Sequence, residues 1–225
     1  MKPISIAIDG PSGAGKSTIA RKTAEKFGFI YVDTGAIYRT VGLAAYRRGI
    51  ASKDSAAVIA MLPELHIELR HGADGLQRIF LDGEDVSDAI RMPEISIYAS
   101  DVSAVPEVRA FLMEMQRSFA RTQNVIMDGR DIGTVVLPDA GLKIFLTASV
   151  EARAKRRQLE LAKKGKNLPF EEVLRDMEYR DKNDSSRAAA PLRPAEDAVR
   201  LDTTQLDFDE SCAAVESLIR ERFAL

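Results

Sequence analysis

Five short runs consist mainly of apolar residues, at residues 4–8, 29–32, 125–127, 142–146 and 199–201. Runs of this length without a strict alternation of polar and apolar residues are typical of strands that are buried on both faces of a parallel sheet. The carboxyl ends of parallel strands share one edge of a sheet, and ligands bind at that edge. We therefore expect the polar residues that end the runs to lie along one rim: Asp9, Asp33, Asp128, Thr147 and Asp202.

Segments with helical spacing separate these runs, at residues 18–27, 36–48, 105–120, 150–164, 170–180 and 210–223. In the third segment Val108, Leu112, Met115 and Phe119 recur every three or four positions, which places them on one helix face. Gly49 follows the second segment, as is common after a helix. Alternating strands and helices predict an α/β fold, with a five-stranded parallel sheet flanked by helices.

Residues 63–91 break this alternation and predict a small antiparallel insert of three strands. Residues 66–70 alternate polar with apolar, residues 76–81 are strand-like, and turn signals stand at Asp74-Gly75 and at Asp82-Gly83. Asp-Gly between two such segments is a strong hairpin signal. We expect a core at residues 1–62 and 92–225, an inserted subdomain at 63–91, and a short helical lid at roughly 153–168.

Composition adds limits to this picture. Of the 225 residues 45% are hydrophobic and 29% are charged, and the net charge is −2, which gives no general argument for nucleic-acid binding. One cysteine excludes an internal disulfide. The first apolar run is short and ends at Asp9, and no run approaches the roughly 18 apolar residues of a membrane span. We expect a cytoplasmic protein with no membrane or nucleic-acid partner.

The most informative motif follows the first apolar run and fits the phosphate-loop pattern G-x-x-x-x-G-K-[ST]. Between a strand and a helix, such a loop directs backbone N–H groups and the positive end of the helix at one anion. Lys16 is expected to reach the β- and γ-phosphates of a nucleoside triphosphate, and the Ser17 hydroxyl to bind Mg²⁺. The predicted ATP-binding residues are Gly10, Pro11, Ser12, Gly13, Ala14, Gly15, Lys16, Ser17 and Thr18.

Two further strand ends carry candidate chemistry. After residues 29–32, Gly35 and the start of a helix predict a second helix terminus that binds an anion, and Arg39 lies one turn into that helix. The alternative is a capped helix with a surface arginine. After residues 125–127, Asp128 resembles the acidic residue that orders Mg²⁺ directly or through water. Arg130 and Asp131 follow it closely beside two glycines, which is unusual for a solvated turn.

The segment at residues 151–193 is basic, with 12 Lys or Arg against 8 Asp or Glu. Arg153, Arg156 and Arg157 are spaced to share one helix face, and such arginines can close over a transferring phosphoryl group or form a solvated face. Residues 181–184 nearly match the N-K-x-D guanine signature of GTPases. We reject that interpretation because they follow a charged helix rather than a buried strand, and begin with Asp.

Four motifs in chain order closely resemble the bacterial cytidylate kinase family, which belongs to the P-loop nucleoside monophosphate kinases. They are residues 9–17, 33–39, 128–134 and 186–192, and residues 83–87 also resemble the extra sheet of that family. The resemblance covers the whole chain. It implies a reaction in which MgATP phosphorylates CMP or dCMP to give ADP and CDP or dCDP. We expect a monomer.

The resemblance also implies roles for single residues. Arg39, Arg130 and Arg187 correspond to clamps on the CMP phosphate, and Lys16 with the lid arginines Arg153, Arg156 and Arg157 to the groups that assist transfer. The remaining substrate-binding positions are Thr34 and Tyr38 beside Arg39, the cytosine readers Ser100, Arg109 and Asp131, and the sugar-contacting pair Arg180 and Asp184. Thr34 stands where the family is expected to have serine, and it retains the hydroxyl.

The chemistry of cytosine suits these residue types. A carboxylate can accept from the N4 amino group and a guanidinium can donate to N3, whereas uracil would leave both groups unpaired. Two alternatives stay open on the residues alone: a P-loop kinase for another monophosphate or a small metabolite such as shikimate, and, more distantly, a regulatory GTP-binding switch.

Overall fold

The computed structural model describes residues 3–72, 77–163 and 165–225, and at its centre is a parallel sheet with strand order β2-β6-β1-β7-β8. Its strands are β1 (Ser5–Asp9), β2 (Ile30–Asp33), β6 (Val125–Gly129), β7 (Leu142–Thr147) and β8 (Val199–Asp202). The five apolar runs are therefore strands, as predicted. The register pairs Asp33 with Asp128 and Asp9 with Gly129, so that the acidic strand ends meet at one edge.

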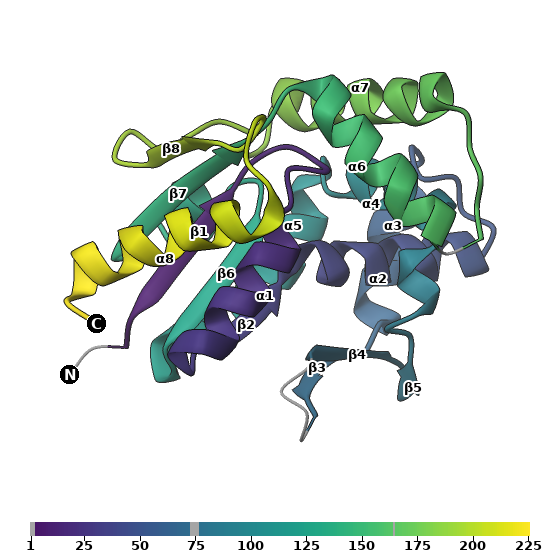
Figure 1. Cartoon of the computed structure of the whole chain (residues 1–225). Coiled ribbons are helices and arrows are strands. Elements are labelled where there is room, and N and C mark those ends of the chain that lie inside the picture. Colours follow the sequence, from purple (N-terminus) through teal and green to yellow (C-terminus); the bar gives the residue numbers. More distant parts are fainter. Residues whose placement is uncertain (1–2, 73–76, 164) are drawn as a thin grey trace.

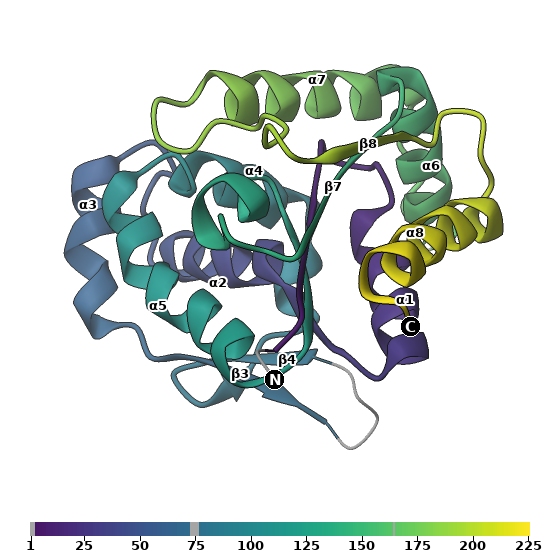
Figure 2. The same cartoon turned by 90° about the vertical axis from the view of Figure 1, so that its left-hand side faces the viewer.

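Helices cover both faces of this sheet (Figure 2). On one face α1 (Lys16–Phe27) and α8 (Phe208–Phe223) pack on Ile6, Ile8 and Ile126. On the other face the intervening residues Ala7 and Met127 pack with residues of α5 (Pro106–Thr122) and of the short helix η3 (Ile132–Val136). In β1 and β6 successive residues thus enter two separate apolar clusters, which explains why apolar residues follow one another in these two strands.

The remaining helices lie beyond the carboxyl edge of the sheet or beside it (Figure 1). Helix α2 (Thr34–Arg47) packs with α4 (Pro93–Val102), and α6 (Val150–Lys163) packs with α7 (Phe170–Ser186). The predicted pattern omitted α4 and also α3 (Ser55–Met61), which is followed by the single turn η1 (Leu62–Glu64). It ended α7 at residue 180, which is wrong, because the helix continues to Ser186.

The insert is a separate antiparallel sheet in the order β3 (Ile67–His71), β4 (Gln77–Leu81) and β5 (Glu84–Asp85), followed by the single turn η2 (Ala89–Arg91). Asp82 and Gly83 both have positive φ, at 51° and 87°, which is the geometry of a type I′ hairpin, as predicted. The predicted turn at residues 74–75 lies outside the described residues.

Side chains of the insert dock it against the edge strand β2 of the main sheet. The amide of Gln77 accepts from the backbone N–H of Asp33 (2.8 Å), and Nε2 of His71 lies 3.1 Å from the carbonyl oxygen of Tyr31. His71 is half-buried at this contact. No helix in the described residues is long and apolar enough to cross a bilayer.

Candidate active site

A cavity of about 600 Å³ opens at the carboxyl edge of the sheet, and most of the predicted site residues line it. The phosphate loop forms one wall. The other walls come from α2, α4, the segment after β6, α6 and α7. The predicted residues on its lining are Ser12, Gly13, Gly15, Lys16, Ser17, Thr18, Thr34, Tyr38, Arg39, Ser100, Arg130, Asp131, Arg156, Arg157, Arg180, Asp184 and Arg187.

The phosphate loop has the geometry of an anion site. Gly10 has a φ of 148°, and a Cβ there would lie 1.9 Å from the carbonyl oxygen of Leu146, so no side chain fits. Helix α1 begins after Gly15 without a capping side chain, which leaves its first N–H groups directed at the loop. The amino group of Lys16 donates to the carbonyl of Pro11 at 2.7 Å. Burial and the neighbouring Arg130 hold the pKa of Lys16 well below its usual value.

Ser17 and Asp128 come together beside the loop, as a magnesium site requires. The hydroxyl of Ser17 donates to Oδ2 of Asp128 at 2.8 Å, and Asp33 is close enough to contribute to the raised pKa of Asp128, which burial chiefly moves to about 6. No cluster of three or more His, Cys, Asp or Glu side chains in the described residues could hold a metal ion. A hydroxyl and a carboxylate beside a phosphate loop nevertheless fit Mg²⁺, which is commonly held by few protein oxygens together with substrate phosphates.

The opposite side of the cavity is rich in guanidinium groups. Arg130 pairs with Asp184 at 2.8 Å, and Arg39 pairs with Asp33 at 3.1 Å. Burial lowers the pKa of Arg180 to about 10, and nearby Arg130 acts in the same direction. The buried Nε atoms of Arg39 and Arg180 have no hydrogen-bond partner among the described residues. Crowded cations with unused donors fit an anionic ligand such as a nucleotide phosphate.

A buried ion-pair cluster centred on Asp131 lies next to these arginines. One carboxylate oxygen of Asp131 accepts from Nη2 of Arg187 at 3.1 Å, and the other accepts from Arg109. Arg187 also donates to the hydroxyl of Ser103 at 3.0 Å. Ser103 was not among the predicted residues, and its place one helical turn after Ser100 was the available signal.

Several predicted residues stand behind the lining and act on it through others. Arg109 and Asp128 reach the cavity through Asp131 and Ser17. Arg153 is buried and donates to the carbonyl of Ser12 at 2.9 Å and to Asp181 at 2.7 Å. Gly10, Pro11 and Ala14 belong to the phosphate loop but do not line the cavity.

The three arginines of α6 have different partners, although their spacing predicted a shared face. Arg153 contacts the phosphate loop, Arg156 donates to the backbone carbonyl of Thr203, and Arg157 pairs with Glu160.

The predicted anion-binding terminus of α2 is corrected, because the Asp33 side chain accepts from the N–H of Ala36 and caps the helix. Arg39 still lines the cavity.

Sequence reasoning did not assign a role to Asp9, which positions the segment that carries Asp131. Its two carboxylate oxygens accept from the N–H groups of Ile132 and Gly133, at 2.8 and 2.7 Å. Burial raises the pKa of Asp9 to about 6, and the two N–H donors oppose this shift. The polar residue that ends the first strand was the signal in the sequence.

The raised pKa of Asp9 predicts a pH-dependent stability. Between an unfolded value of 3.8 and a folded value of about 6, the folded protein binds more protons than the unfolded chain. The free energy of unfolding should therefore fall as pH rises through this window, by up to about 3 kcal/mol from Asp9. Urea unfolding of the wild type and of Asp9→Asn from pH 4 to 7 tests this. A difference between the two proteins that does not change with pH would contradict it.

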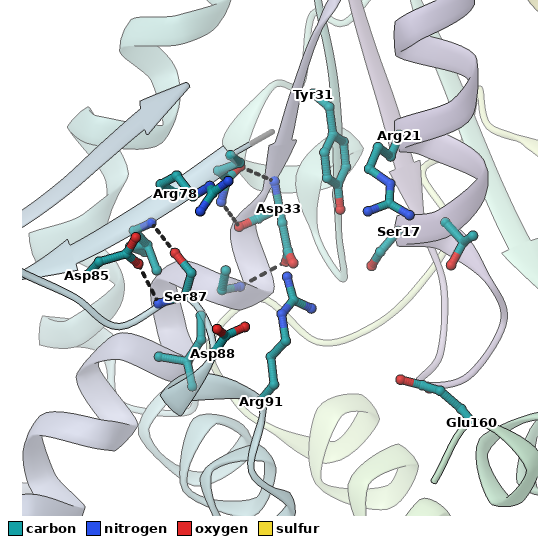
Figure 3. A pocket seen from close by; sticks show the side chains of 15 residues that line it. Ser17, Arg21, Tyr31, Asp33, Arg78, Asp85, Ser87, Asp88, Arg91 and Glu160 are labelled. Atoms are coloured by element: carbon teal, nitrogen blue, oxygen red, sulfur yellow. Dashed lines mark hydrogen bonds between the residues drawn. The ribbon is translucent and has the colours of Figure 1, made fainter. Parts of the chain in front are cut away.

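A second cavity of about 460 Å³ adjoins the first, between α1, β4 and η2 (Figure 3). Ser17, Thr18, Asp33, Arg91 and Glu160 line both cavities, so the two are continuous beside the phosphate loop. In Figure 3 the side chains of Tyr31 and Arg21 point toward this shared region.

Comparison with known proteins adds independent information. The family model described as cytidylate kinase matches residues 6–221. The chain is 52% identical to the cytidylate kinase of Caldicellulosiruptor bescii over 93% of this chain and 92% of that protein. It is 52% identical to that of Desulfitobacterium hafniense, over 98% and 94% of the two chains. Among solved structures, shikimate kinase from Bacteroides thetaiotaomicron is similar over 99% of both chains, with a TM-score of 0.49 and 13% identity.

Proposed function

The chain belongs to the cytidylate kinase family, and from this premise we propose how its cavity works as a two-substrate site. The protein is a nucleoside monophosphate kinase that transfers a phosphoryl group to CMP or dCMP. The observation that carries the arrangement is a single cavity with a phosphate loop on one side and buried, partly unpartnered guanidinium groups on the other.

We propose that the phosphate loop holds the ATP phosphates. The uncapped N–H groups of α1 and the amino group of Lys16 supply positive charge where the transferring phosphoryl group accumulates negative charge. The Ser17 hydroxyl would hold Mg²⁺, with Asp128 behind it and acting through water. When bound, Mg²⁺ neutralises the charge on the phosphate oxygens.

Acceptor binding is proposed for the other half of the cavity. Arg39, Arg130 and Arg187 would clamp the phosphate of CMP, and Arg180 with Asp184 would contact the sugar. Asp131 and Ser100 would read the cytosine, and Arg109 would act through Asp131. A phosphate oxygen of CMP then attacks the γ-phosphorus directly, so no protein nucleophile is needed, and the protein contributes positioning and charge.

We propose that the insert at 63–91 supports this acceptor half and that residues 153–168 form a lid. Ile67, Ile79 and Leu81 of the insert pack in one apolar cluster with residues of α2 and α4, the helices that carry Arg39 and Ser100. On the lid side, Arg156 and Arg157 line the cavity. Since one chain supplies both halves, we propose that it works as a monomer, in the cytoplasm where its nucleotide substrates occur.

A substrate panel tests this function. Release of ADP should be rapid with CMP or dCMP and about 10²- to 10⁴-fold slower with UMP, because uracil leaves buried polar groups unpaired. AMP and shikimate serve as further acceptors. Comparable turnover of UMP or AMP would contradict the cytosine assignment, and tight GTP binding without acceptor-dependent turnover would favour a switch.

A further inference from the structure

Tyr31 places a hydroxyl on the carboxylate that stands behind the proposed magnesium site. Its Oη donates to Oδ1 of Asp128 at 2.8 Å, while Ser17 donates to Oδ2 of the same side chain, also at 2.8 Å. The two carboxylate oxygens are therefore each held by one hydroxyl. Tyr31 and Ser17 also line the second cavity, where Figure 3 shows both hydroxyls directed toward the same region.

The register of the sheet explains how Tyr31 reaches Asp128. Tyr31 pairs with Ile126 in the parallel β2–β6 ladder, so Tyr31, Ile126 and Asp128 point to the same face. Asp128 lies two residues further along, or about 6.6 Å of strand, a length that a tyrosine spans and a shorter side chain does not. The ring of Tyr31 packs against the apolar cluster under α1, which fixes its direction.

The backbone around Tyr31 is also held in place. The carbonyl of Tyr31 contacts Nε2 of His71, and the N–H of Asp33 donates to Gln77, so the insert holds the edge of β2 that faces away from β6. The Tyr31 side chain therefore starts from a backbone that is held in place. The hydrogen bond from its hydroxyl restricts rotation of the Asp128 carboxylate.

A restricted Asp128 determines how Ser17 presents its oxygen. A hydroxyl has one hydrogen and two lone pairs. With the hydrogen of Ser17 committed to Oδ2 of Asp128, the lone pairs of Ser17 remain for a cation. If the carboxylate rotated, the hydrogen would lose its fixed partner, and the lone pairs would lose their fixed direction. Groups that orient a metal ligand in this way commonly change metal affinity about 10- to 100-fold when removed.

We propose that Tyr31 is a positioning residue for Mg²⁺, which it serves by fixing Asp128 and, through Asp128, the hydroxyl of Ser17. The inference rests on the proposed function, because it takes Ser17 and Asp128 as the magnesium site. Tyr31 itself contacts neither substrate in this scheme.

The test is calorimetric titration of ATP into Tyr31→Phe, once with Mg²⁺ and once with EDTA. The ring and its packing remain in this variant, and only the hydroxyl is lost. Affinity for MgATP should fall about tenfold, while affinity for metal-free ATP and for CMP stays at the wild-type value. Tyr179→Phe is the matched control, because it removes a tyrosine–carboxylate bond of the same length, 2.8 Å to Asp101, away from the phosphate loop. The control should bind MgATP as the wild type does.

A second comparison tests whether Tyr31 acts through the carboxylate of Asp128. Asp128→Ala and the double variant Asp128→Ala/Tyr31→Phe should bind MgATP equally, because neither has a side-chain oxygen at position 128 for Tyr31 to hold. Unchanged MgATP affinity in Tyr31→Phe, equal losses with and without Mg²⁺, or a further tenfold loss in the double variant would each overturn the proposal. Ser17→Ala tests the magnesium site itself, separately from the role of Tyr31. If ATP binding to Ser17→Ala depends on Mg²⁺ as it does in the wild type, the proposed magnesium site is wrong, and the role of Tyr31 at that site is wrong too.

Discussion

Lys16→Ala should lose phosphoryl transfer by at least about a thousandfold in kcat while remaining folded. The amino group of Lys16 is buried inside the phosphate loop, where its observed partner is the carbonyl of Pro11. An amino group there can move to the β- and γ-phosphates of ATP and stabilise the charge that develops on them. No other side chain of the loop at residues 10–18 carries a positive charge, so no other residue of the loop replaces it.

The fold should tolerate this change because Lys16 contributes little to it. Burial, together with the neighbouring Arg130, disfavours its charged form, as the lowered pKa shows, and no carboxylate forms an ion pair with it in the described residues. Unfolding by urea should give a free energy within about 1 kcal/mol of the wild type.

Lys26→Ala provides the control on the same helix. Lys26 is exposed at the far end of α1, pairs with Glu216 and does not line either cavity, so its loss should leave ADP release unchanged. Substantial turnover by Lys16→Ala would contradict the role assigned to the phosphate loop.

The parallel sheet could be predicted from the sequence because its central strands β1, β6 and β7 are largely buried and appear as runs of mainly apolar residues. The end of α7 could not be predicted in this way. Val173, Met177 and Asp184 are all buried at helical spacing, so one face of α7 remains buried throughout. In its last two turns that face contacts a polar cavity, and polar residues replace the apolar ones. A pattern based on hydrophobicity therefore ends the helix too early.

The site, like the fold, has features that could be predicted from the sequence and features that could not. The phosphate loop and the acidic strand ends are local patterns, and local patterns can be found in one sequence. Tyr31 and Asp128 are 97 positions apart in the sequence, and their contact depends on the register of β2 and β6, which no local pattern contains. The capping of α2 by Asp33 was an open alternative, because a carboxylate before a helix can cap it or leave it to a ligand.

Asp131→Asn should reduce the preference for CMP over UMP by about 10²- to 10⁴-fold in kcat/KM. The carboxylate of Asp131 lines the cavity, and Arg109 and Arg187 hold its two oxygens. We propose that it accepts from the N4 amino group of cytosine. An asparagine amide can instead donate to the O4 carbonyl of uracil, so turnover of UMP should fall less than turnover of CMP, or rise.

Asparagine is the more informative replacement because it keeps the size of the side chain and one acceptor oxygen, whereas alanine removes both acceptors; both replacements remove the charge from the ion pairs. Removal of the Asp131 side chain leaves two buried guanidinium groups, those of Arg109 and Arg187, without this carboxylate. Loss of one partner from a buried pair costs about 3–5 kcal/mol of stability. Both variants bear this cost, but the remaining oxygen of Asp131→Asn can still accept from one of the two arginines, so Asp131→Ala should be the less stable of the two in urea unfolding.

Asp101→Asn is a matched control for a buried carboxylate outside the cavity. Asp101 is held by Ser52 and Tyr179 and does not line the cavity, so this variant should keep the wild-type ratio of CMP to UMP. Steady-state kinetics with both acceptors decide the matter. If Asp131→Asn loses stability but keeps the wild-type ratio, Asp131 only holds Arg109 and Arg187 in place. In that case the choice of base must come from those arginines or from Ser100.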